Sequence, residues 1–134
     1  MWYYVNYRHN IYLIYIYIIT MKIAITGSPS LVEQHLEKYL PSDVTEIICC
    51  GDKGIDLCAK TYAINNNLIY REFLPNYKKY GKNSIVIRNQ ILAEYSDYAI
   101  IFWDGLSQET KEIINTFKTI NKKIYIIRRN NNIK

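Results

Sequence analysis

Two glycine- or serine-bearing turns in this chain are placed to bind an anion. The first, residues 51–54, follows an apolar run at 46–49 and opens into a helical pattern. The second, residues 104–110, follows an apolar run at 98–103 and does the same. A helix start presents unpaired backbone N–H groups and the positive end of its dipole. Two such starts at the ends of neighbouring parallel strands predict an anion pocket.

Each side chain of these turns has a structural and a functional interpretation. Gly51 and Gly54 permit positive φ, which serves either a tight turn or close approach of a ligand. Asp56 either caps the helix or accepts a hydrogen bond from a sugar or base. Ser107 and Thr110 either cap the next helix or reach a phosphate at its start.

Further candidates come from other parts of the chain. Gly27 and Ser28 follow the first apolar run. Arg88 and Asn89 lie on a mainly apolar helical pattern, where an arginine needs an anionic partner unless it is exposed. Lys82 lies on a polar loop and could contact a ligand. The aromatic side chains of Tyr77, Tyr80 and Trp103 could serve as further contacts, the first and last by stacking on a base.

The motifs do not dictate a reaction. The sequence contains neither a Walker lysine motif nor Gly-x-Gly-x-x-Gly, and no histidine is placed as a general base. An enzyme cleaving an N-glycosidic bond would need a carboxylate in the pocket. The candidates are Asp56, Asp104 and Glu109. Glu109 suits the helix dipole but would repel a phosphate at short range.

The elements that must position these residues alternate between strand and helix. The predicted strands are 22–26, 46–49, 68–73, 98–103 and 123–127, and the predicted helices are 31–40, 55–66, 84–94 and 107–120, with a loop at 75–83. This alternation predicts an α/β fold, a Rossmann-like three-layer sandwich. Its mainly parallel sheet of about five strands should carry helices on both faces. Every candidate turn falls at the carboxyl end of a strand, where ligands bind in such sheets.

Size and composition suit one cytoplasmic domain. The chain has 134 residues, 49% of them hydrophobic, and a net charge of +5. The basic residues are scattered, which favours a solvated surface over a nucleic-acid footprint. The three cysteines include no Cys-x-x-Cys pair, so we expect reduced thiols and no metal site. We expect Cys49 to end a buried strand and Cys58 to pack on a helix, whereas Cys50 lies in the turn and could be exposed.

Residues 1–20 differ from the rest. They are rich in tyrosine, isoleucine and asparagine, and their apolar run at 11–19 is shorter than the roughly 20 residues of a membrane helix. We interpret them as an extension, which could lie upstream of a true start at Met21. A membrane anchor is the alternative. The domain is then 21–128, followed by a polar tail at 129–134.

Four segments in order carry a resemblance to a known family. They are 23–28; 49–56 with Gly51, Gly54 and Asp56; 74–89 with Leu74-Pro75, Tyr80-Gly81-Lys82 and Arg88-Asn89; and 102–110, Phe-Trp-Asp-Gly-Leu-Ser-Gln-Glu-Thr. With them the chain resembles the SLOG superfamily, which contains DprA and the LOG phosphoribohydrolases, and within it the small YspA- or YpsA-related family. The pattern differs at Cys50 and Glu109, where that family has glycine, and at Ile113, where LOG enzymes have glutamate.

Members of this family are often found in bacteria and phages. The resemblance implies binding of a nucleotide or nucleotide-derived ligand. An ADP-ribose-like signal or a nucleoside phosphate would fit, with the protein acting as sensor or carrier and needing no resident cofactor. The alternatives are a LOG-related N-glycosidic hydrolase and DprA-like binding of single-stranded DNA. A homodimer is expected by analogy.

Overall fold

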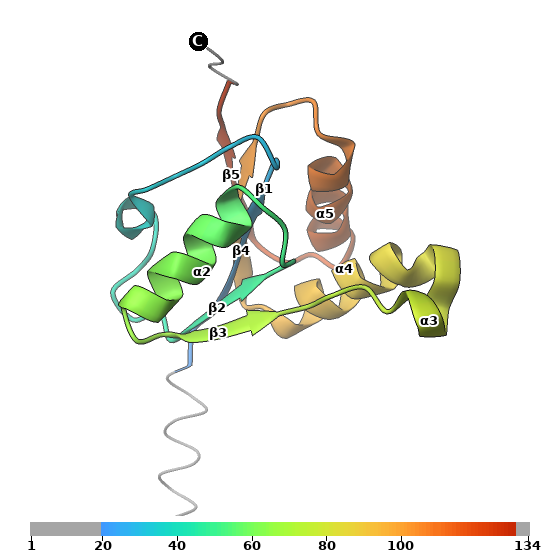
Figure 1. Cartoon of the computed structure of the whole chain (residues 1–134), viewed down its shortest axis with the longest axis horizontal. Coiled ribbons are helices and arrows are strands. Elements are labelled where there is room, and N and C mark those ends of the chain that lie inside the picture. Colours follow the sequence, from blue (N-terminus) through green and yellow to red (C-terminus); the bar gives the residue numbers. More distant parts are fainter. Residues whose placement is uncertain (1–19, 131–134) are drawn as a thin grey trace, which may run out of the picture.

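A single five-stranded parallel sheet forms the centre of the molecule (Figure 1). The computed structural model describes residues 20–130. The strands are β1 (Lys22–Gly27), β2 (Glu46–Cys49), β3 (Ile69–Glu72), β4 (Tyr98–Trp103) and β5 (Ile124–Arg128). Every neighbouring pair is parallel and the order is β3-β2-β1-β4-β5. The predicted fold class is therefore confirmed.

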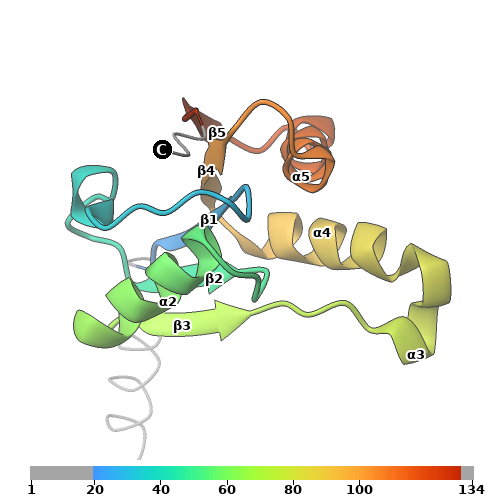
Figure 2. The same ribbon diagram turned by 45° about the horizontal axis from the view of Figure 1, so that its top comes forward.

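Helices cover both faces of this sheet. α2 (Ile55–Asn65) lies on one face, and α4 (Ser84–Tyr95) and α5 (Gln108–Thr119) lie on the other (Figure 2). Three short elements complete the fold, η1 (Leu36–Lys38), α3 (Tyr77–Tyr80) and η2 (Gly81–Asn83). The last two form part of the segment predicted as loop at 75–83.

The strands are apolar on both sides because each side faces a separate core. On the α2 face, Ile23, Ile25 and Phe102 are fully buried against residues such as Ala59. On the other face, Ala24 and Ile101 of the same strands pack in a core that includes Phe117 of α5. The continuous apolar runs that predicted the strands are thus required by the two cores.

The predicted helix at 31–40 is wrong. Only the 3-10 turn η1 forms there, and the residues before it are irregular. Of the apolar positions that suggested a helix, Leu31 and Leu36 are buried, whereas Val32 is 66% exposed. Two anchors five residues apart can be buried by an irregular chain as well as by a helix. The pattern therefore did not specify the helix.

The turn after β2 contains Cys50, whose exposure the sequence left open. Only 7% of its surface is accessible, because it packs in the core on the α4 and α5 face. Cys49 ends β2 fully buried, as predicted. Cys58 is half-buried on α2, where it packs against the core on the α2 face of the sheet.

Two further expectations concern the ends of the chain. The extension, apart from Thr20, and the tail beyond Asn130 lie outside the described residues. Among residues 20–130, no helix is long and apolar enough to cross a bilayer.

Candidate functional site

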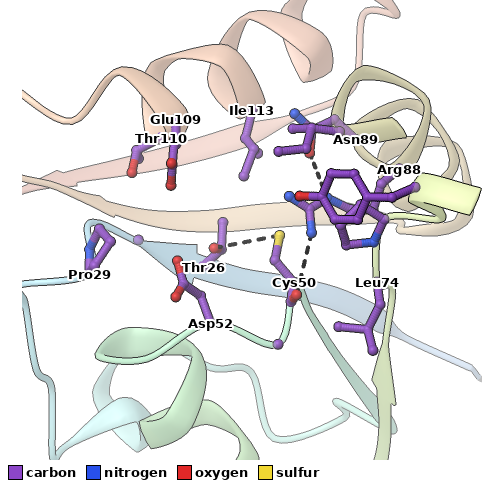
Figure 3. Close-up of a pocket in the computed structure, with 15 residues that line it drawn as sticks. Thr26, Pro29, Cys50, Asp52, Leu74, Arg88, Asn89, Glu109, Thr110 and Ile113 are labelled. Atoms are coloured by element: carbon purple, nitrogen blue, oxygen red, sulfur yellow. Dashed lines mark hydrogen bonds between the residues drawn. The ribbon is translucent and has the colours of Figure 1, made fainter. Parts of the chain in front are cut away.

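A pocket of about 300 Å³ opens where the strand order reverses (Figure 3). The chain builds the sheet outward from β1 to β3 and then restarts on the other side of β1 with β4. The connections therefore leave the carboxyl ends of β1 and β4 in opposite directions, which creates a crevice. The pocket is lined by Thr26, Gly27, Pro29, Cys50, Gly51, Asp52, Leu74, Pro75, Tyr77, Ile85, Arg88, Asn89, Glu109, Thr110 and Ile113.

Gly27 lets β1 and β4 close the base of the pocket. A Cβ on Gly27 would lie 2.5 Å from the carbonyl oxygen of Phe102 and 2.8 Å from the side chain of Ile55. Such contacts are too short for any side chain, so only glycine allows this approach. The next residue, Ser28, donates its backbone N–H to the same Phe102 carbonyl at 2.9 Å.

Asp56 organises the turn between β2 and α2 from inside the protein. It is 1% exposed, and its Oδ2 accepts the backbone N–H groups of Cys50 and Asp52, each at 3.1 Å. Its Oδ1 accepts the hydroxyl of Thr26 at 2.8 Å. Asp56 does not line the pocket. Its carboxylate therefore holds the turn before α2 and does not cap the helix, because the two N–H groups that it accepts precede the helix start at Ile55.

Burial dominates the protonation of this carboxyl group. Loss of solvent raises the pKa of Asp56 above its ordinary 3.8, while the bonds from Thr26, Asp52 and Cys50 oppose the rise. Burial likewise raises the pKa of the Cys50 thiol to about 12, with the nearby Asp56 carboxylate contributing. The Cys50 thiol in the pocket wall is therefore neutral near pH 7 and is a poor nucleophile.

Arg88 brings a positive charge to the pocket from α4. Its Nε donates to Asn89 Oδ1 at 2.9 Å, and its Nη1 donates to the carbonyl oxygen of Cys50 at 3.4 Å (Figure 3). The same Nη1 also donates to the carbonyl oxygen of Phe73 at 3.3 Å. These acceptors are all neutral. No carboxylate among residues 20–130 lies within salt-bridge distance of Arg88. The guanidinium is thus held in place without a counter-ion.

The start of α5 forms the opposite wall. Ser107 is the N-cap and accepts the backbone N–H of Thr110 at 3.4 Å and its hydroxyl at 3.0 Å. Thr110 is buried yet reaches the pocket, and its hydroxyl lies 3.5 Å from that of Ser28. Ser28 itself is fully buried and accepts the N–H of Asp104 at 3.1 Å. These hydroxyls tie the ends of β1 and β4 to α5.

Two carboxylates line the pocket and a third supports it. Glu109, in the first turn of α5, and Asp52, after β2, are both exposed at the lining. Asp104 lies outside the lining, and its Oδ1 accepts the N–H groups of Ser107 and Leu106 at 2.8 and 2.9 Å. Those two bonds lower the pKa of Asp104. Of the three carboxylates suggested from the sequence, only Glu109 faces the pocket.

The structure brings together half of the residues predicted for the site. Gly27, Gly51, Arg88, Asn89 and Thr110 line one pocket, although they come from four separate parts of the chain. The other half lie outside the lining, namely Ser28, Gly54, Asp56, Lys82 and Ser107.

Sequence reasoning missed the apolar part of the pocket lining, which we call the apolar wall. It contains Leu74, Pro75, Ile85 and Ile113, beside the exposed ring of Tyr77. The dipeptide Leu74-Pro75 belongs to the segments that carry the family resemblance, and it follows the predicted strand at 68–73. Its position at a strand's carboxyl end was the available signal. Trp103, by contrast, donates its indole N–H to the carbonyl of Ser107 at 3.1 Å and does not line the pocket.

Comparison with protein-family models, with curated proteins and with solved structures finds no match to this chain.

Proposed function

We propose that the pocket at the strand-order reversal binds a nucleotide or nucleotide-derived ligand, with the protein acting as sensor or carrier. The observation that carries this proposal is the guanidinium of Arg88, which lines the pocket with only neutral acceptors. A phosphate would supply the missing counter-ion through charge-assisted hydrogen bonds. The family resemblance supports the same ligand class.

The rest of the lining suits the other parts of such a ligand. The apolar wall and the exposed ring of Tyr77 offer a surface for a base. The carboxylates of Asp52 and Glu109 can accept hydrogen bonds from sugar hydroxyl groups. A volume of about 300 Å³ lies at the small end of ligand pockets. The three cysteines of the described chain are free thiols, which are usual in the reducing cytoplasm. A cytoplasmic location is therefore part of this proposal.

Titration calorimetry tests the proposal with a nucleoside monophosphate, ADP-ribose, NAD and the matching nucleoside without phosphate. We expect a phosphate-bearing compound to bind, and to bind more tightly than the nucleoside. Arg88→Gln should weaken that compound about ten- to a hundredfold, since a hydrogen bond to a charged group contributes roughly 1.5–3 kcal/mol. Binding by none of the compounds would reject the proposal.

Lys82→Gln is the matched control. It removes the same charge from an exposed position on η2, outside the pocket lining. We expect its affinity to equal that of the unmodified protein. If both variants weakened binding equally, the charge of the whole molecule rather than Arg88 would be responsible. Circular dichroism melting of both variants separates lost binding from lost folding.

The carboxylate of Glu109 favours a second candidate, hydrolysis of an N-glycosidic bond. A pocket carboxylate can activate water or protonate a leaving base. Chromatography after long incubation with nucleoside monophosphates should then show free base. Glu109→Gln should abolish this release, whereas Glu112→Gln, one turn further along α5 and outside the lining, should not. Unchanged substrate with the unmodified protein rejects this candidate.

Single-stranded DNA binding is the least supported candidate. Arg88 is the one basic residue in the described lining of this pocket. A salt series of DNA affinity tests it, because contacts to phosphates give a steep loss of affinity with salt.

A further inference from the structure

An apolar groove lies on the far side of the sheet from α4 and α5. It has a volume of about 680 Å³ and runs along β4 and β5. Its lining includes Tyr39, Leu40, Tyr98, Ile100, Tyr125 and Ile127. We call it the β4–β5 groove. It is separate from the pocket that contains Arg88, because the two share no lining residue.

The groove marks a gap in the helical layer. α2 packs on β1, β2 and β3, and the predicted helix at 31–40 does not form. Tyr39 in the lining packs its ring against Phe102, with the two centroids 5.2 Å apart. Tyr125, which also lines the groove, is 46% exposed although it belongs to a strand. Parallel sheets are normally covered on both faces, and β5 is also a sheet edge with unpaired backbone groups.

We propose that residues 11–19 of this chain cover the β4–β5 groove. The described chain enters the sheet beside the groove. Met21 packs against the core of the same face, and Ile23 pairs in register with Tyr98 at the start of β4. Residue 19 is therefore only two positions before Met21, which belongs to the face that contains the groove.

Length and chemistry fit this occupant. The groove follows β5, whose five residues extend about 17 Å at 3.3 Å per residue. Nine residues span about 14 Å as a helix and about 30 Å when extended, so either conformation covers most of it. The segment Ile-Tyr-Leu-Ile-Tyr-Ile-Tyr-Ile-Ile carries no charge and matches the apolar lining. Exposed to solvent, such a segment would promote aggregation.

A second copy of the protein fits the groove less well. Lys38 lines it, and Lys123 and Arg128 lie at the two ends of β5. A two-fold contact through β5 would bring the partner's copies of these cations close to them. Like charges so placed oppose association. An uncharged segment meets no such repulsion.

Thiol labelling of the full chain tests the proposal. Tyr125→Cys places a cysteine in the groove, and Gln90→Cys places a control cysteine at an exposed position of α4. Both variants also carry Cys58→Ser, which removes the half-buried native thiol. We expect the groove cysteine to react at least tenfold more slowly than the control. Replacing Ile14 and Ile16 by aspartate should raise its rate to that of the control. Circular dichroism checks that this variant folds.

A cross-link gives an independent measurement without the aspartates. Cysteines at positions 16 and 125 should be joined within one chain by a short bifunctional reagent, whereas cysteines at 16 and 90 should not. The proposal is overturned if the groove cysteine reacts as fast as the control. It is also overturned if protection disappears on dilution to a monomer, which would assign the groove to a second copy. Protection that survives both aspartates without the intramolecular cross-link would likewise overturn it.

Discussion

At the scale of single residues, the pocket depends on the carboxylate of Asp56, which lies outside the pocket lining. Asp56 accepts three hydrogen bonds, from Thr26 and from the backbone of Cys50 and Asp52. Those three residues all line the pocket. Asp56 therefore shapes the site from behind, and its buried position raises its pKa.

The raised pKa gives a pH-dependent expectation for Asp56→Asn. An amide can rotate so that its oxygen accepts both backbone N–H groups and its nitrogen donates to Thr26. The fold should therefore survive. Because the folded pKa exceeds the unfolded one, the contribution of Asp56 is fully present below the unfolded pKa and is lost as pH rises through the folded pKa. The difference in unfolding free energy should thus shift toward the asparagine variant as pH rises from about 3 to 7.

Urea unfolding of both proteins across this pH range measures the difference, in which the other titrating groups cancel. Asp56→Ala is the control that removes the acceptor altogether. It should cost roughly 2–4 kcal/mol, because two backbone N–H groups lose their partner. A difference between the protein and its asparagine variant that is constant with pH, or that shifts the other way, would contradict the assignment.

At the scale of elements, the turn before α2 is held by contact with the irregular segment that follows β1. Gly54 has φ +74° and ψ −122°, and a Cβ there would lie 2.6 Å from the carbonyl oxygen of Pro29 and 2.7 Å from that of Leu31. Gly81 has nearly the same backbone conformation, φ +54° and ψ −127°, with no atom within 4 Å of the added Cβ. The two glycines differ in their surroundings, not in their backbone.

This pair separates strain from steric overlap. Gly81→Ala should cost about 1–3 kcal/mol of unfolding free energy through backbone strain alone. Gly54→Ala should cost clearly more, since the backbone of residues 29–31 must also move. Chemical denaturation of both variants measures the difference. Equal costs would show that the contact of Gly54 with residues 29–31 contributes nothing to stability.

The start of α5 offers a different trade between stability and binding. Glu109→Gln removes a negative charge that favours the helix dipole, which should cost about 0.3–1 kcal/mol of stability. The same change removes repulsion in the pocket and should raise the affinity for a phosphate-bearing ligand by roughly two- to fivefold. Calorimetry and denaturation on one preparation measure both effects. An unchanged or weaker affinity would mean that the phosphate lies away from α5.

Predictability from sequence differed between elements for a physical reason. The bounds of β2 and β4 were predicted without error. A strand such as 98–103 has a core on each face of the sheet, so its whole run of residues must be apolar. The helix at 31–40 could not, because two buried leucines are compatible with more than one backbone path. The site residues followed the same rule. Gly27 and Thr110 were found from their place at element ends, whereas Ile113 is an ordinary apolar residue whose position only the packed helix reveals.

At the scale of the whole molecule, the sheet should be least stable on the side that carries the apolar wall of the pocket. β1 is paired on both sides and buried on both faces, while β3 is a four-residue edge strand with Ile69 57% exposed. Yet β3 leads directly to Leu74 and Pro75 in the pocket lining. A marginal strand thus positions one wall of the site.

Hydrogen exchange in the native state can locate this weakness. The amides of Ile69 and Phe73 donate to carbonyl oxygens of Thr45 and Cys49, at 3.1 and 3.0 Å. We expect them to exchange at least about tenfold faster than the amides of β1, which corresponds to an opening free energy roughly 1.4 kcal/mol lower. A ligand in the pocket should slow Phe73 more than Ile25, because it contacts the segment that opens with β3. Uniform slowing of both strands would instead mean that β3 and the pocket wall open only when the whole domain unfolds.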